Sequence, residues 1–115
     1  MSEQAETPYA RLIRTRTADL RARALAAVLA AEEAARPFGA RVLVFGSFAN
    51  GKFGRWSDID LGVAAAPEYA VDAVRAVTHA VEDHGFECDV FDIATTSGSL
   101  RERILRDGRE PAALG

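Results

Sequence analysis

Apolar residues recur at helical spacing through the first third of the chain. Thr7 and Pro8 form a helix start, with Thr7 able to cap the first turn, and Pro37 ends the pattern. We expect either one helix over about residues 8–36 or two helices joined near residues 15–17. The predicted apolar stripe consists of Ile13, Leu20, Ala24, Ala27, Val28, Ala31 and Ala35. Its small side chains also permit close contact with a partner helix.

The middle of the chain has the pattern of two strands joined by a glycine-bearing turn. Residues 41–45 form a nearly continuous apolar run, which is typical of a buried strand. Gly46-Ser47 breaks this run, and we expect a short helical turn at residues 48–51, followed by a loop. Polar and apolar residues then alternate over residues 57–61, which indicates a second strand with one buried face.

The second half continues with a helix, a strand and a closing helix. Residues 67–84 carry valines at helical spacing, and we expect these to face the core: Val71, Val74, Val77 and Val81. Residues 86–94 have the pattern of a third strand. A last helix is predicted to about residue 107, capped within the Thr-Thr-Ser run 95–97. Residues 110–115 are expected to form a frayed terminus.

This succession of elements is typical of an α/β domain with a single small mixed β-sheet flanked by helices. We expect residues 1–115 to form one domain, with an N-terminal helix at about 8–36 and a core at about 37–107. Hydrophobic residues make up 49% of the chain and charged residues 27%, as in soluble globular proteins. A chain of 115 residues can bury one core but is short for an enzyme that encloses its substrate.

Charge and cysteine content narrow the classes of function. The net charge of −3 argues against broad binding to nucleic acid or anionic membranes, since both need a basic surface. No apolar run is long enough to span a bilayer, and residues 1–6 lack the pattern of a secretory signal. The single cysteine, Cys88, cannot form an internal disulfide, so we expect a cytoplasmic protein.

Two aspartates are the first candidate functional residues. Asp58 and Asp60 are two positions apart in a predicted strand, so their carboxylates project from the same face while Ile59 and Leu61 face the core. Like charges held this close repel, and a divalent cation between them relieves the repulsion. Hard oxygen ligands of this kind suit magnesium, which takes one or two carboxylates together with substrate phosphates.

A glycine turn precedes these aspartates by a short loop. Gly46 permits close approach of the backbone to a ligand, and Ser47 offers a hydroxyl to an anion. Lys52, in the loop, is within reach of a bound triphosphate. A P-loop is excluded because Phe53 follows Gly51-Lys52, where that motif needs Ser or Thr. The combination of metal ligands and an anion cradle is what a nucleoside triphosphate requires.

A third carboxylate is available from the last predicted strand. Two metal ions that bridge a nucleotide need a further acid, both to hold an ion and to accept the proton of the attacking hydroxyl. Asp89 and Asp92 are the candidates. They face opposite sides of a strand, so only one of them can join Asp58 and Asp60.

Phe45-Gly46-Ser47 followed by Ser57-Asp58-Ile59-Asp60-Leu61 resembles the signature of the DNA polymerase β-type nucleotidyltransferase superfamily, and the small size resembles its minimal nucleotidyltransferase (MNT) branch. The resemblance implies a polymerase β palm-like core and transfer of a nucleoside monophosphate from ATP, or another nucleoside triphosphate, to a hydroxyl. It also implies the site residues. These are Asp58, Asp60 and Asp89 for catalysis and for two Mg²⁺ ions, and Gly46, Ser47, Lys52 and Ser57 for the nucleotide.

The resemblance also implies a partner. MNT domains pair with a helical HEPN protein as antitoxin and toxin, and the MntA-like antitoxin adds nucleotides to the HEPN ribonuclease. One alternative is a binding module that silences a helical partner by occlusion, and another is a small-molecule nucleotidyltransferase. The arginines of the first helix and of the tail at residues 101–109 are interpreted as solvated surfaces, and His79 and His84 as surface histidines.

Overall fold

Three short strands form a mixed sheet at the centre of the structure, a computed structural model that describes residues 6–54 and 57–114. The strand order is β1-β2-β3; β1 runs antiparallel to β2, and β2 parallel to β3. The elements in chain order are α1 (Pro8–Ala35), β1 (Arg41–Phe45), α2 (Gly46–Ala49), β2 (Ile59–Ala64), α3 (Ala70–Asp83), β3 (Cys88–Asp92) and α4 (Gly98–Asp107). This arrangement confirms the predicted α/β class.

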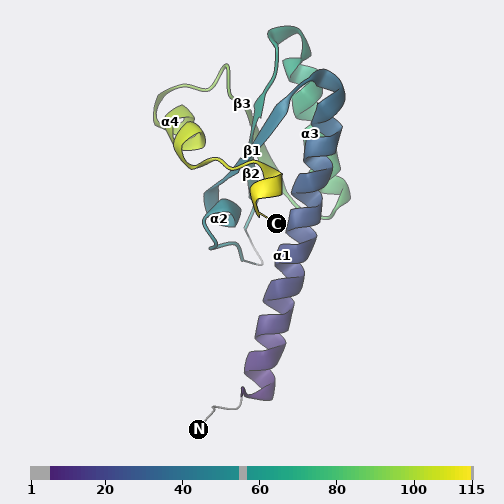
Figure 1. Ribbon diagram of the computed structural model, residues 1–115, viewed down its shortest axis with the longest axis vertical. Helices are drawn as coiled ribbons and strands as arrows, with labels where there is room; N and C mark the ends of the chain where they lie inside the picture. Colours follow the sequence, from purple (N-terminus) through teal and green to yellow (C-terminus); the bar gives the residue numbers. More distant parts are fainter. Residues whose placement is uncertain (1–5, 55–56, 115) are drawn as a thin grey trace.

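The alternation of side chains along the strands separates two cores. α1 and α3 lie side by side over one face of the sheet, and α4 covers part of the other (Figure 1). The first core joins both long helices to alternate strand residues: Val42, Val44, Ile59, Leu61 and Val63. The second core is smaller and consists of Phe45, Ile93 and Ile104, with Leu43, Phe91 and Leu100 around it.

α1 is one continuous helix of 28 residues, begun by Thr7, whose hydroxyl accepts a hydrogen bond from the Ala10 amide at 3.0 Å. Its C-terminal half carries the buried alanines and contacts the body. Its N-terminal half extends away from the body, and residues 7–19 are all exposed (Figure 1). The expected stripe is therefore confirmed from Leu20 onwards, whereas Ile13 remains 45% exposed. No helix among the described residues is both long and apolar enough to cross a membrane.

The segment after α4 is ordered against the body. Val44 and Arg109 exchange two backbone hydrogen bonds, with N···O distances of 2.7 and 2.8 Å, so this segment extends the edge of β1. A short 3-10 helix (Pro111–Leu114) follows, and Pro111 is buried. The expectation of a frayed terminus at residues 110–115 is wrong for residues 110–114, because a free strand edge and an apolar contact hold them; Gly115 lies outside the described residues.

Other local expectations need correction. The short helix after β1 spans Gly46–Ala49, two residues earlier than expected, and Val71 is 68% exposed instead of facing the core. Ser97 is the N-cap of α4 but makes no side-chain capping bond. The hydroxyls of Thr95 and Thr96 accept no helical amide; they donate to the Asp92 carbonyl. These differences concern turn geometry and helix phase, which depend on contacts far away in the sequence.

Candidate active site

Asp60 and Asp89 occupy neighbouring positions on adjacent strands. They are register partners in the parallel pair β2–β3, so their side chains project from the same face of the sheet. Phe45 is the antiparallel partner of Asp60 on β1, which places all three residues in one row. Asp58 lies just before β2, two residues from Asp60, and is exposed like Asp89. The strand register thus brings Asp60 and Asp89 to one face, and Asp58 lies close enough to affect the charge of Asp60.

Asp60 is the carboxylate most affected by its surroundings. Burial raises the pKa of Asp60, and repulsion by Asp89 and then by Asp58 raises it further; the nearby charge of Arg103 acts in the opposite direction. The side chain is only half-buried. Asp60 is therefore repelled by the two neighbouring carboxylates. A bound cation would relieve this repulsion.

Gly46 contacts this carboxylate directly. Its φ angle is +73°, a conformation that favours glycine. A Cβ atom at this position would collide with Oδ2 of Asp60. Two independent features, backbone conformation and close approach, therefore require glycine here. The predicted neighbourhood of glycine turn and carboxylate is present in the structure.

The other predicted nucleotide-binding residues lie less centrally. The Ser57 hydroxyl accepts a hydrogen bond from the Gly54 amide at 3.0 Å, and Ser57 lines a shallow pocket on the Asp58 side. Lys52 is exposed, and its amide donates to the Asn50 side chain at 3.0 Å. Ser47 is half-buried in α2. The phosphate roles of Ser47, Lys52 and Ser57 stay predictions, and Arg55 and Trp56 of the same loop lie outside the described residues.

The carboxylate group fits a hard divalent cation in its chemistry. Within residues 6–54 and 57–114, no three acidic, His or Cys side chains converge into a ready-made metal site. Magnesium is commonly held by one or two carboxylates with the remaining ligands from water and substrate phosphates. Asp60 and Asp89 supply oxygen ligands of the right kind on one face, and Asp58 supplies a third within electrostatic range of Asp60. The assignment of metal ions to them is consistent with this donor set but remains a prediction.

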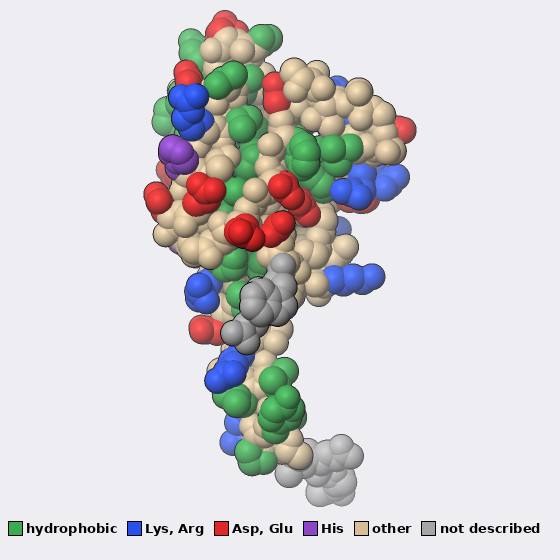
Figure 2. Space-filling view, turned by 180° about the vertical axis from the view of Figure 1, so that it is seen from behind, with side chains coloured by type: hydrophobic (Ala, Val, Ile, Leu, Met, Phe, Trp, Pro, Cys, Tyr) green, Lys and Arg blue, Asp and Glu red, His purple; other side chains and the backbone are tan. Residues whose placement is uncertain are grey.

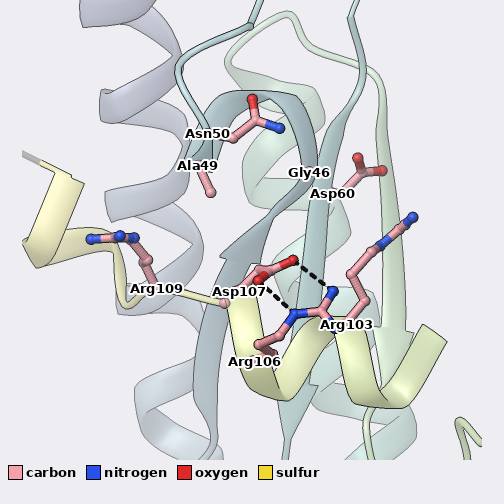
Figure 3. Close-up of a pocket in the computed structure, with 9 residues that line it drawn as sticks. Gly46, Ala49, Asn50, Asp60, Arg103, Arg106, Asp107 and Arg109 are labelled. Carbon is pink, nitrogen blue, oxygen red and sulfur yellow. Dashed lines mark hydrogen bonds and ion pairs between the residues drawn. The ribbon is translucent and has the colours of Figure 1, made fainter. Parts of the chain in front are cut away.

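A pocket of about 670 Å³ opens beside Asp60, between α2 and the C-terminal part of α4 (Figure 3). Such a volume lies within the usual range for small-molecule sites. Arg103 lies near Asp60 and its guanidinium group stands over the Phe45 ring, 5.5 Å from the ring centre. The pocket is lined by Gly46, Ala49, Asn50, Asp60, Arg103, Arg106, Asp107, Gly108 and Arg109.

The arginines of this pocket are the functional candidates that the sequence interpretation missed. They are exposed, as expected, but they face a recess beside the carboxylates and are more than a plain solvated surface. Their spacing, three residues apart at 103, 106 and 109, was the available signal. In the first helix, Arg21 and Arg23 stand over the rings of Phe48 and Phe86, at 4.8 and 5.5 Å from the ring centres. Those two side chains therefore cover aromatic residues.

Acidic side chains gather on one face of the body, near its middle (Figure 2). Asp58, Glu87 and Asp89 are all exposed, and Glu87 lies two positions from Asp89, just before β3. Asp92, the other candidate acid, accepts a hydrogen bond from the Ala94 amide at 3.1 Å and so caps the turn after β3. Cys88 packs against the first core, and burial raises its pKa to about 11, with smaller contributions from Glu82, Asp89 and Asp58.

Comparison with known proteins identifies the family of this domain. The family model "Polymerase beta, Nucleotidyltransferase" matches residues 39–110. A solved structure of a proposed minimal nucleotidyltransferase is 34% identical, with a TM-score of 0.62, over 79% of this chain and 91% of that chain. No curated protein matches the chain.

Two toxin–antitoxin structures resemble the chain more distantly. One contains AMP-PNP and is 24% identical with a TM-score of 0.48; the other is an MntA–HpeT mutant, 20% identical with a TM-score of 0.45. Each match covers 62% of this chain, which spans 58% and 57% of those chains.

Carboxylates on adjacent strands, set against a glycine turn in a small mixed sheet, define a nucleotidyltransferase-type α/β domain. The match to the family model and the 34% identical structure make the assignment specific. The chain belongs to the polymerase beta nucleotidyltransferase family and resembles its minimal members.

Proposed function

We propose that this protein transfers a nucleoside monophosphate, AMP from ATP, to a hydroxyl group of a partner protein in a magnesium-dependent reaction. The observation that carries the proposal is the position of Asp60. It lies beside Asp89 on the neighbouring strand, close to Asp58, and in contact with the positive-φ turn at Gly46. The proposal is also supported by the recess that Asp60 lines, which has the volume of a small-molecule site.

The side chains divide the reaction between them. Asp58 and Asp60 hold two magnesium ions, and Asp89 helps to hold one of them. Magnesium, when bound, offsets the charge on the attacking and leaving oxygens. Gly46 and Ser47 bind the outer phosphates, assisted by Lys52 and Ser57.

Asp89, which is exposed, accepts the proton of the acceptor hydroxyl. The acceptor oxygen forms a bond to the α-phosphorus, and the bond from that phosphorus to the bridging oxygen breaks. Pyrophosphate leaves with the electron pair.

The acceptor is proposed to belong to a helical HEPN ribonuclease, with this chain as its antitoxin. The support is the resemblance to MNT proteins and the openness of the site. Asp58 and Asp89 are exposed to solvent, and neither of them lines the recess beside Asp60, which is walled by α2 and α4. Binding energy for the acceptor therefore has to come from a second surface. A cytoplasmic location is part of the same proposal.

A second candidate is a binding module that neutralises its partner by occlusion. The observation that favours it is the projecting half of α1, on which Tyr9, Leu12 and Ile13 are 73%, 45% and 45% exposed. These positions, at i, i+3 and i+4, form one apolar strip on the half of the helix whose residues are all exposed. A surface of this kind can bind a partner without chemistry. A small-molecule nucleotidyltransferase is the third possibility.

The test is transfer of label from [α-³²P]ATP with magnesium to the protein encoded by the neighbouring gene. We expect the partner to be labelled and its ribonuclease activity to fall in parallel. Asp58→Ala is expected to abolish both effects, whereas Asp72→Ala, an exposed acid on α3, leaves them unchanged. Neutralisation by Asp58→Ala equal to that by the unaltered protein would favour occlusion. Labelling of small hydroxyl compounds alone would favour the third possibility.

A further inference from the structure

The pocket beside Asp60 has an acidic end at Asp60 and basic side chains along α4. Asp60 and Gly46 lie at the end formed by the strands, whereas Arg103 and Arg106 project from α4 on the wall below (Figure 3). The two arginines are one helical turn apart, so their side chains are neighbours on the helix surface. A ligand that fits this recess has a part compatible with the carboxylates and a part that carries strong negative charge.

Arginine is the side chain best suited to such a negative group. Its planar guanidinium group donates several hydrogen bonds in a fixed geometry that matches phosphate oxygens. The guanidinium group of Arg103 lies over the Phe45 ring, and this contact orients the side chain. Arg106 pairs with Asp107 through two contacts, Nε to Oδ1 at 3.0 Å and Nη2 to Oδ2 at 3.2 Å. Both partners of that pair are largely exposed.

The orientation of a nucleotide in the pocket follows from these charges. The reacting α-phosphate has to lie at Asp60, where the carboxylates are. The remaining phosphates then extend either along α4 or away from it. Only the first orientation places them beside Arg103 and then Arg106. The opposite orientation leaves two guanidinium groups against an uncharged nucleoside.

We propose that Arg103 and Arg106 bind the β- and γ-phosphates of the substrate from the α4 side of the pocket, in that order from Asp60 and opposite the turn at Gly46-Ser47, and so select a nucleoside triphosphate over di- and monophosphates. This rests on the proposed function, because it takes the carboxylates as the site of the α-phosphate. Asp107 competes with the γ-phosphate for Arg106. Its removal therefore strengthens binding of the triphosphate.

The assignment is tested by calorimetry with three ligands in the presence of magnesium: AMP, α,β-methylene-ADP and α,β-methylene-ATP. The methylene group replaces the oxygen at the bond that transfer would break, so binding is measured without turnover. Arg106→Gln is expected to weaken the triphosphate about tenfold and to leave the diphosphate unchanged, since a charge-assisted hydrogen bond contributes about this much. Arg103→Gln is expected to weaken the diphosphate and the triphosphate alike, with AMP unaffected.

Asp107→Asn supplies an effect of opposite sign, because it frees Arg106 and is expected to strengthen the triphosphate about two- to fivefold. Arg16→Gln, on the projecting half of α1, is the matched control and is expected to change none of the three affinities. An unchanged preference for the triphosphate in Arg106→Gln, or equal weakening of AMP, would overturn the assignment even if transfer itself is intact. A chain that binds the triphosphate as described but transfers nothing to any acceptor would overturn the proposed function instead.

Discussion

The two faces of the small sheet serve different purposes. On the face covered by α1 and α3, the residues of β1 and β2 are apolar and at most 2% exposed, as Val44, Leu61 and Val63 illustrate, and Val90 of β3 is half-buried. On the other face, the same strands carry Asp60, Asp89 and Gly62 in addition to a few apolar residues. Because successive side chains of a strand point to opposite faces, one strand can supply apolar residues to the core and polar residues to the other face. The larger core thus lies on one side of the sheet and the candidate site on the other.

On the second face, Gly62 lets α4 pack close to the sheet. A Cβ atom on Gly62 would lie 2.9 Å from Ile104 and 3.0 Å from Ile93, so the absence of a side chain lets α4 sit close to the sheet. Ile104 is fully buried there, and Arg103 next to it reaches the pocket. The small core on this face therefore positions the arginines, and its loss has consequences beyond stability.

Asp60→Asn is expected to have the largest effect on the face that carries the candidate site. We expect nucleotidyl transfer to fall by about a thousandfold or more, because losing a metal-binding charge removes several kcal/mol of transition-state stabilisation. The measurement is the initial rate of label transfer from [α-³²P]ATP. Asp72→Asn, on α3 and remote from the sheet face, is the control with an unchanged rate.

The same substitution should stabilise the fold. Burial and the neighbouring carboxylates raise the pKa of Asp60 above its ordinary value of 3.8, so the folded state binds more protons than the unfolded state between these two pKa values. The contribution of Asp60 to stability therefore declines as the pH rises through that window and stays unfavourable above it. Urea unfolding as a function of pH should show this decline in the unaltered protein but not in Asp60→Asn. A less stable variant at neutral pH would contradict the account.

Gly46→Ala compares a glycine at the site with a glycine elsewhere. Both Gly46 and Gly39 have positive φ, at 73° and 64°, but a Cβ on Gly39 meets nothing within 4 Å. Both substitutions should cost about 1–2 kcal/mol of folding free energy through backbone strain. Only Gly46→Ala displaces the Asp60 carboxylate, so we expect about a hundredfold loss of transfer for it alone. Equal activity in the two variants would show that Gly46 has only a backbone role.

A pair of core truncations compares the two faces directly. Val77 on α3 and Ile104 on α4 are both fully buried, in the first and second cores respectively. Val77→Ala should lower the free energy of unfolding by about 1.5–3 kcal/mol and Ile104→Ala by about 2–5 kcal/mol. Affinity for α,β-methylene-ATP, measured well below each midpoint of unfolding, should fall only in Ile104→Ala. An equal loss in both variants would remove the distinction between the faces.

The last prediction concerns the reactivity of Cys88, which packs against the first core. Burial raises the pKa of its thiol to about 11 from 9.0. Because only the thiolate reacts, alkylation at about pH 8 should be roughly a hundredfold slower in the folded protein than in the unfolded chain. The raised pKa also means that stability declines as the pH rises from 9.0 towards 11. Fast alkylation of the folded protein would place Cys88 in solvent.

The parts predictable from sequence are those set by local periodicity. The hydrophobic runs predict the strands to within a few residues, whereas the shared face of Asp58 and Asp60 stays a prediction from their spacing. The choice of Asp89 over Asp92 needed the family resemblance, and the register of β2 with β3 now places Asp89 beside Asp60.

The missed features depend on tertiary structure. Whether Arg103 faces solvent or a pocket depends on how closely α4 approaches Gly62, which no local pattern encodes. The ordered segment after α4 depends on the free edge of β1, and the exposure of Val71 depends on where α1 crosses α3. Each of these features depends on a contact between segments distant in sequence, which a local sequence pattern does not predict.

The central claim is that the carboxylates of the α4 face hold a divalent cation together with a nucleotide. Paramagnetic broadening by Mn²⁺, followed by NMR of the backbone amides with α,β-methylene-ATP present, tests this most directly. The account predicts broadening at Gly46, Asp60 and Asp89, with signals of α3 unaffected, and its loss in Asp60→Asn. Broadening centred on another surface, or undiminished broadening in Asp60→Asn, would contradict it.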